Sequence, residues 1–490
     1  MGQLLDRCFV ATVTSVTHVL PRKTKIVATL GPATDEPGVL DAMVAAGLDC
    51  ARVNCSHGTT EERVQRASAV RAAAALAGRP VGLLFDLQGP KLRLAGNTYE
   101  RWVQAGDAIT FTSDPSTISA DSVAVDFGGF AALVTERSEI IVGDGVPRFA
   151  VGSRSNGAVL AQAVMAGPLA PRKGINVTYA KPDLPAITSK DALDLETAVA
   201  VWADFIALSF VRSAADIEDL RRRLQAAGSR ALIVAKIETV EAYENLDEII
   251  AVVDGAMVAR GDFGVTAGLA RVPLMQKDII SRATQAGKFV ITATQMLESM
   301  VHAPEPTRAE VADVANAVID GTSAVMLSAE TGVGDHPVEA VTAMGQIAEA
   351  AEESPVFHGR ARSAANGRES SPAAVMHAAV GLADELGAAA LVVPTTTGGA
   401  ARACAKFRPR TPVLALAYDP LVARQLTVDW GVRPVHLERE EVGDERELRR
   451  AMEIARETGP LDPGDRIVLT GGAGASASRG TNAIVVHELF

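Results

Sequence analysis

The chain has few aromatic side chains, few cysteines and no long apolar run. Phe, Trp and Tyr make up 4% of its 490 residues, and its four cysteines show neither paired nor metal-type spacing. We therefore expect reduced core or loop thiols in a cytoplasmic protein rather than a disulfide framework. No run approaches the ~18 apolar residues of a membrane-spanning helix, and Asp6 and Arg7 interrupt the apolar region that a signal peptide needs.

Excess positive charge is also missing. The formal net charge of −12 argues against nucleic acid or an anionic membrane as the main partner. It does not exclude a local site with positive charge. The apolar content of 48% and the charged content of 22% are typical of a globular protein. A chain of this length is expected to form about three domains.

Short apolar runs alternate with helical patterns through most of the first 353 residues. Eight strand–helix units, from residues 25–31 to residues 324–327, predict a closed (β/α)8 barrel, with a doubly wound open sheet as the alternative. The rhythm breaks after the third strand, where short β-like pieces predict a small inserted β-barrel lid domain. The predicted domains are a lead (1–22), the barrel (23–91 and 173–353), the inserted β domain (92–172), a linker (354–371) and a C-terminal α/β domain (372–490).

Two neighbouring strands in residues 232–265 end in charge. Lys236 and Glu238 follow one apolar run and share a face of the strand, while Asp262 follows the next run. Gly261 would let backbone approach a ligand closely. Two carboxylates beside an ammonium are typical of a site that binds a divalent metal next to a phosphoryl group. The alternative is that these residues only form ion pairs with one another at the ends of the strands.

Polar side chains follow most of the other predicted strands as well. The active site of a barrel lies where its strands end, so these side chains are expected to converge. They are Arg52, Asn54, Ser56, Asp86, Ser209, Thr294, Gln295, Ser328 and Glu330.

Several segments, in order and from residue 22 to about 340, closely resemble motifs of the pyruvate kinase family. They include ARVNCSHG, FDLQGPKLR, AKIE, MVARGD, ITATQMLESM and PTRAEVADVANAVIDG. The resemblance implies a glycolytic enzyme that transfers the phosphoryl group of phosphoenolpyruvate to ADP, giving pyruvate and ATP. It also implies a homotetramer. Two other readings stay open, a metal-dependent enolpyruvate lyase and a catalytically silent metabolite sensor.

The resemblance assigns the charged residues to metal and phosphoryl chemistry. Glu238 and Asp262 would hold Mg²⁺ or Mn²⁺, and Arg52 and Lys236 would neutralise the transferring phosphoryl group. Backbone amides near Gly261 and Asp262 would seat the substrate carboxylate.

Proton transfer and nucleotide binding are assigned in the same way. Thr294 would help to position the proton that the enolate receives, with Ser328 as a candidate relay; strand-end hydrogen bonding is the alternative for Ser328 and for Ser209. On the nucleotide side the resemblance implies His57, Asp144, Arg172 and Lys173, although Gly-Asp-Gly around Asp144 is by itself typical of a tight turn. Closure of the inserted domain would exclude water.

One loop departs from the members of the family that require K⁺. Residues 86–91 read DLQGPK instead of DTKGPE, and Leu94 stands where those members have Thr. The Lys91 ammonium would replace the charge of K⁺, so K⁺ is not expected to be required. Asn54, Ser56 and Asp86 match K⁺ ligands and would then be structural; a solvated Lys91 is the alternative.

Two further features concern the metal loop and the C-terminal domain. Phe263 and Thr266 replace the usual Leu and Glu after Asp262, which leaves the packing of that loop open. A turn able to cradle a phosphate is formed by Thr395, Thr396, Thr397, Gly398 and Gly399. Because residues 471–482 lack the Trp associated with activation by fructose 1,6-bisphosphate, a sugar monophosphate or a nucleotide is the expected effector; a purely structural turn is the alternative.

Overall fold

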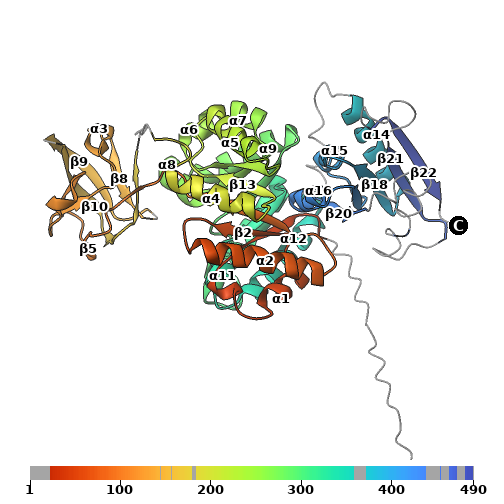
Figure 1. The fold of residues 1–490 in the computed structure, drawn as a ribbon, viewed down its shortest axis with the longest axis horizontal. Helices are drawn as coiled ribbons and strands as arrows, with labels where there is room; N and C mark the ends of the chain where they lie inside the picture. Colours follow the sequence, from red (N-terminus) through yellow and green to blue (C-terminus); the bar gives the residue numbers. More distant parts are fainter. Residues whose placement is uncertain are drawn as a thin grey trace, which may run out of the picture.

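The chain folds into three bodies arranged in a row. The computed structural model describes residues 22–143, 145–155, 157–178, 184–357, 371–437, 453, 463–471 and 481–488. The inserted β domain and the C-terminal domain lie at opposite ends of a central α/β body (Figure 1). The predicted lead before residue 22, most of the predicted linker, Asp144 and residues 472–480 lie outside the described ranges.

The central body is a closed barrel of parallel strands, as predicted. β1 pairs with both β2 and β17, so the sheet has no free edge and the open doubly wound alternative is wrong. The strand order is β1-β17-β16-β15-β14-β13-β3-β2. The strands are β1 (Lys25–Leu30), β2 (Cys50–Asn54), β3 (Gly82–Asp86), β13 (Phe205–Leu208), β14 (Leu232–Ile237), β15 (Gly255–Ala259), β16 (Phe289–Ala293) and β17 (Ala324–Leu327).

Helices cover the outside of the barrel. Three of them begin at capping boxes, in which the threonines 59, 188 and 307 exchange hydrogen bonds with the acidic residue three positions on. The helices are α1 (Val39–Ala45), α2 (Thr60–Leu76), α4 (Ser189–Ala200), α5 (Ala214–Ala226), α6 (Val240–Glu244), α7 (Leu246–Val252), α8 (Arg260–Ala267), α9 (Val272–Gln285), α10 (Arg308–Asp320), α11 (Ala329–Gly332) and α12 (Pro337–Glu352).

The inserted domain is built from short strands with its own apolar core. A seven-stranded sheet runs in the order β4-β12-β8-β9-β10-β6-β7, beside a two-stranded β11-β5 ribbon. The strands are β4 (Leu92–Arg93), β5 (Arg101–Val103), β6 (Ala108–Thr112), β7 (Ser122–Ala124), β8 (Glu139–Val142), β9 (Arg148–Ser155), β10 (Ala158–Met165), β11 (Gly167–Leu169) and β12 (Gly174–Val177), with a short helix α3 (Phe130–Leu133).

The chain enters and leaves this domain side by side. β4 on the way in pairs antiparallel with β12 on the way out, and β12 continues the sheet by pairing with β8. The sheet therefore extends to Val177, past the return predicted after Arg172. The β4–β12 pair forms the hinge between the barrel and the inserted domain.

The C-terminal domain is an α/β sheet, as predicted. Its strands run in the order β20-β19-β18-β21-β22, and β22 is antiparallel to β21. The elements are α14 (Ser371–Leu386), β18 (Ala390–Thr395), α15 (Gly399–Lys406), β19 (Val413–Ala417), α16 (Pro420–Gln425), a 3-10 turn η5 (Leu426–Val428), β20 (Val432–His436), β21 (Arg466–Gly471) and β22 (Ala483–Glu488).

The C-terminal domain closes the amino end of the barrel. Val428 of η5 belongs to the same apolar cluster as the side chains that fill the barrel, and the Lys23 ammonium donates to the carbonyls of Pro409 (3.0 Å) and Arg410 (2.7 Å). The inserted domain leaves from the carboxyl end of β3, so the open end of the barrel faces it. Within the described ranges, no helix has the length and apolar character needed to cross a membrane.

Candidate active site at the carboxyl end of the barrel

Asp86, the last residue of β3, holds together the two cations predicted to face the phosphoryl group. Its Oδ2 accepts from Arg52 Nε at 2.8 Å, and its Oδ1 lies 3.2 Å from Lys236 Nζ. Burial favours a raised pKa for Asp86, but Lys236 and Arg52 outweigh it and hold the pKa below its usual range. Thr29 on β1 accepts a further hydrogen bond from Arg52 Nη1, at 2.9 Å. Asp86 thus remains ionised and orients both cations.

Lys236 uses its three ammonium hydrogens on three protein oxygens. Besides Asp86, it contacts Glu238 Oε1 at 2.9 Å and Ser209 Oγ at 2.7 Å. Burial by itself lowers the pKa of Lys236, but the two carboxylates raise it above its ordinary value, so the group stays charged. The Ser209 hydroxyl donates to the Leu87 carbonyl at 2.7 Å, which combines a strand-end hydrogen bond with the positioning of Lys236.

The two predicted metal carboxylates lie next to each other. Burial raises the pKa of Glu238, and the negative charge of Asp262 adds to that rise, while Lys236 and the Phe210 amide oppose it. Glu238 Oε2 accepts the Phe210 N–H at 2.8 Å, and Asp262 Oδ1 contacts Lys91 Nζ at 2.6 Å. No cluster of three or more His, Cys, Asp or Glu suited to a metal occurs in the described part of the chain. Two hard, mutually repelling oxygen donors nevertheless fit Mg²⁺, which is commonly held by one or two carboxylates together with substrate oxygens.

Thr294, just after β16, has an unusual backbone. Its φ of 68° and the φ of 52° at Gln295 lie in the left-handed region, which is uncommon for a β-branched residue. The Arg260 guanidinium stabilises this loop by donating to the carbonyls of Thr294 (2.6 Å) and Gln295 (2.9 Å) and by pairing with Asp313 (2.6 Å). Arg260 was not among the predicted site residues, although a charged residue that follows a buried strand directly is a signal in the sequence.

The side chain of Thr294 joins two neighbouring strand ends. Its hydroxyl donates to the Ala293 carbonyl at 2.6 Å and accepts from the Gly261 N–H at 2.9 Å. The Gly261 N–H is therefore already hydrogen-bonded to Thr294. It was expected to be free to bind the substrate carboxylate. Asp262 follows in the first turn of α8, which begins directly at Arg260 where a loop was expected.

Comparison of the sequence with known proteins identifies the family of the chain. A family model described as the pyruvate kinase barrel domain matches residues 21–341, and one described as the pyruvate kinase alpha/beta domain matches residues 373–487. The chain belongs to the pyruvate kinase family. It is 39% identical over 479 residues to pyruvate kinase 2 of Synechocystis sp., covering 96% of this chain and 80% of that protein. It is 38% identical over 465 residues to the pyruvate kinase of Methylorubrum extorquens, covering 94% and 96%.

Ser328, the residue proposed as a relay by resemblance to the family, has a free hydroxyl. Its Oγ is buried and has no hydrogen-bond partner among the described residues. Its backbone N–H donates to Glu330 Oε2 at 2.6 Å, and Glu330 Oε1 accepts from the Leu297 N–H at 3.1 Å. The carboxylate of Glu330 thus ties the end of β17 to the loop after β16.

The residues expected, by resemblance, at a monovalent-cation position lie close together. Asn54 and Asp86 are paired in register on β2 and β3, and Asn54 Oδ1 accepts from the Ser56 N–H at 3.1 Å. Lys91 does not contact these residues in the described part of the chain, because its ammonium lies on Asp262. The side chain of Leu94 is fully buried and carries no oxygen.

The residues predicted on the nucleotide side lie around the hinge. His57 is exposed on the β2–α2 loop, and its pKa is lowered by partial burial and by the cations Arg93 and Arg52. Arg172 has a left-handed φ of 59°, and its carbonyl accepts from Arg93 Nη1 at 3.1 Å. The Lys173 side chain passes over Gly143. Asp144 lies outside the described residues.

The metal loop adapts to its two departures from the family pattern. Phe263 is fully buried, and the Thr266 hydroxyl lies 3.2 Å from the carbonyls of both Glu238 and Phe263. Thr266 therefore ties α8 to the end of β14. A cavity of about 470 Å³ opens beside it, between the barrel and the hinge; its lining includes Lys91, Ile175, Phe210, Arg212, Thr266 and Arg271.

The predicted effector turn starts α15 of the C-terminal domain. Thr395 is buried, and its Oγ accepts from the Gly398 N–H at 2.9 Å, so this hydroxyl shapes the turn from inside. Gly398 has a φ of 82°, which favours glycine. Thr396, Thr397 and Gly399 remain exposed on the turn.

Proposed function

We propose that this protein transfers the phosphoryl group of phosphoenolpyruvate to ADP, giving pyruvate and ATP, as a glycolytic enzyme of the cytoplasm. The bond between phosphorus and the enol oxygen breaks, a bond from a terminal oxygen of ADP to phosphorus forms, and the enolate takes a proton at its methylene carbon. The observation that carries the proposal is the convergence of Arg52, Lys236, Glu238 and Asp262 at the open end of the barrel.

Arg52 and Lys236 act on the charge of the moving phosphoryl group. Phosphoryl transfer needs positioning and cations more than covalent help, and both cations are pre-oriented by Asp86. Glu238 and Asp262 would hold Mg²⁺ or Mn²⁺, which supplies further positive charge to the phosphoryl and enolate oxygens when bound.

Thr294 and Ser328 serve the proton that the enolate receives. A hydroxyl is a weak acid, so Thr294 positions the proton donor, and the unpaired Ser328 hydroxyl is a candidate relay. Closure of the inserted domain, with His57, Asp144, Arg172 and Lys173 on the nucleotide side, would keep water from the phosphoryl group.

The enzyme is proposed to work without K⁺. Lys91 brings an ammonium into the site, and Leu87 and Leu94 are buried side chains without oxygen, unsuited to bind a cation. A sugar monophosphate or a nucleotide is proposed as an effector at Thr396, Thr397 and Gly399, and a homotetramer as the assembly.

The test is a coupled assay of pyruvate formation from phosphoenolpyruvate and ADP with Mg²⁺. It is run with K⁺ and with tetramethylammonium at equal ionic strength. Equal turnover in both buffers is expected. Turnover that requires K⁺ would overturn the role of Lys91 and keep the reaction, whereas no turnover in either buffer would overturn the reaction.

A further inference from the structure

Lys91 ends on Asp262, a carboxylate that the proposed function gives to the metal. The two atoms, Lys91 Nζ and Asp262 Oδ1, are 2.6 Å apart, and both side chains are largely shielded from solvent. Among the described residues, this is the ion pair that neutralises Asp262. Glu238 is neutralised in a similar way, because its Oε1 is paired with the ammonium of Lys236. Each predicted metal carboxylate therefore has a lysine as its counter-ion.

The backbone of Lys91 is held in place by hydrogen bonds of the loop that leads to the hinge. The Leu87 N–H donates to the Ala207 carbonyl at 3.0 Å, and the Gly89 N–H donates to Asp191 Oδ1 at 3.1 Å. The Lys91 N–H closes the loop on the Gly89 carbonyl at 3.0 Å. Lys91 is thus anchored at its backbone, and only its flexible stem can move.

The stem of Lys91 passes through a narrow gap to reach Asp262. It lies directly over Gly174 of β12, where an added Cβ would overlap the Lys91 Cε, and the ammonium lies 5.7 Å from the centre of the Phe210 ring. A side chain at position 174 would overlap the stem where it now lies and would push it aside. The cavity beside it, which Lys91 lines, gives the stem room to move away.

A divalent cation cannot take the place of the Lys91 ammonium on Asp262 Oδ1 while the ammonium stays there, because the two charges repel at contact distance. We propose that Lys91 is a positioning residue that occupies Asp262 in the metal-free enzyme and is displaced when the metal binds. Lys91 then lowers the affinity of the enzyme for the metal. It delivers its own charge to the site only after the metal is in place. This inference rests on the proposed role of Asp262.

The experiment measures the binding of Mn²⁺ alone, without substrates, by the electron paramagnetic resonance signal of the free ion. Lys91→Met keeps the apolar stem and removes the charge. It is expected to bind Mn²⁺ about fivefold more tightly, in line with the loss of one partly screened competing ion pair.

Two further variants separate displacement from a general effect of charge. Gly174→Ala keeps the Lys91 charge but pushes its stem away from its present place beside Asp262, so it is expected to tighten Mn²⁺ binding in the wild-type background and to add nothing to Lys91→Met. Arg271→Met removes an exposed cation from the lining of the same cavity without breaking an ion pair of the described structure, and a change of less than about twofold is expected. Circular dichroism checks that each variant is folded.

The outcomes distinguish the two levels of the proposal. Equal affinities in wild type and Lys91→Met would overturn the inference and leave the proposed function standing. Equal tightening by Lys91→Met and Arg271→Met, with none by Gly174→Ala, would also overturn it in favour of a general charge effect. No Mn²⁺ binding by either the wild type or Lys91→Met would overturn both the inference and the metal role of Asp262.

Discussion

Arg260 shows how one side chain can set the backbone of a loop at the candidate active site. A left-handed φ at a β-branched residue costs about 1–3 kcal/mol and persists only when its surroundings over-determine it. At Thr294 this constraint comes from the planar guanidinium of Arg260, which reaches two carbonyls and a carboxylate together. The position of the Thr294 hydroxyl therefore depends on a residue that need not touch the substrate.

Arg260→Lys is expected to lower kcat by roughly 10- to 100-fold, because a lysine lacks the fork that holds the loop and a displacement of about 1 Å at the reacting centre is costly. The measurement is steady-state turnover per folded enzyme, well below the Tm of the variant. Arg66→Lys is the control, because Arg66 makes a similar two-point pair with Asp35 on the surface. An Arg260→Lys enzyme with wild-type kcat would contradict the positioning role.

Strand periodicity was enough to place some site residues but not others. Lys236 and Glu238 were predicted on one face because they are two positions apart in a strand, and their side chains are in contact. The partner of Lys91 carried no such signal, since a long flexible side chain in a loop can reach many places. Asp86 was expected at this end of the barrel, but its pairing with both Arg52 and Lys236 was not predicted, because contacts between strands depend on the closure of the barrel.

At the scale of elements, the strongest sequence signals were the buried parallel strands. Continuous apolar runs such as residues 324–327 coincide with β17, because strands of a barrel are buried on both faces. The short helix α8 was missed because Gly261, Asp262 and Gly264 resemble a loop, although tertiary contacts make the segment helical. β12 was missed as part of the inserted sheet, since its pairing with β4 spans the whole insertion.

One glycine in the barrel tests how tightly its interior is packed. Gly255 opens β15, and an added methyl group there would overlap the ring of Phe289, which packs edge-on against Phe205 with the ring centres 5.8 Å apart. Gly255→Ala is expected to lower the stability by about 1–3 kcal/mol through overpacking. Thermal unfolding followed by circular dichroism measures the shift in Tm.

Gly381 supplies the matched control for that substitution. It lies within α14, and an added Cβ would have no neighbour within 4 Å. Gly381→Ala is expected to leave the Tm unchanged or to raise it, since glycine inside a helix costs about 0.5–1 kcal/mol relative to alanine. If both substitutions gave the same Tm, the packing argument at Gly255 would fail.

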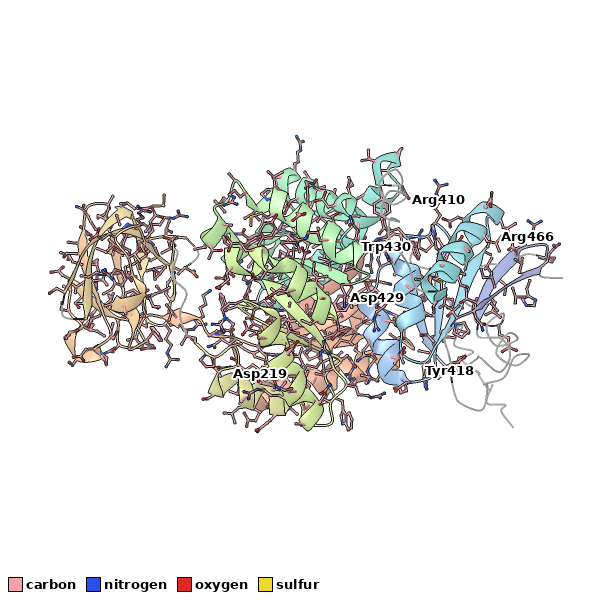
Figure 2. The ribbon with its side chains drawn as sticks, turned by 90° about the horizontal axis from the view of Figure 1, so that it is seen from above. Asp219, Arg410, Tyr418, Asp429, Trp430 and Arg466 are labelled. Carbon is pink, nitrogen blue, oxygen red and sulfur yellow. The ribbon has the colours of Figure 1, made fainter. Side chains whose placement is uncertain are left out.

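At the scale of the whole molecule, the two ends of the barrel have separate tasks. The inserted domain and the C-terminal domain lie on opposite sides of the barrel (Figure 1). The charged side chains lie at the carboxyl end of the strands, from which the inserted domain leaves, and the C-terminal domain packs against the other end. Asp429 and Trp430 lie at the border between the barrel and the C-terminal domain (Figure 2). The sequence predicted all three domains, but not this docking, because polar contacts between domains have no periodic pattern.

The border between the barrel and the C-terminal domain contains a buried carboxylate with a poor partner. Asp429 Oδ2 lies 3.4 Å from Arg402 Nε, yet it has no hydrogen bond among the described residues. Burial raises the pKa of Asp429 to about 6, although Arg402, Lys25 and Arg408 pull it down. The folded protein therefore binds this proton more readily than the unfolded chain, where the pKa is about 3.9.

The contribution of Asp429 to the stability should consequently rise as the pH falls through 6 toward 4, because stability falls with pH wherever the folded state binds more protons. A Asp429→Asn variant lacks this titration, so the free energy of unfolding of the wild type is expected to gain about 1 kcal/mol relative to the variant between pH 7.5 and pH 5. Urea unfolding of both proteins at the two pH values measures this difference. The comparison cancels the other titrating groups and any constant effect of the lost charge on Arg402. If the difference in the free energy of unfolding between wild type and variant were the same at both pH values, Asp429 would have the same pKa in the folded and unfolded states. Its contact with Arg402 would then compensate for its burial.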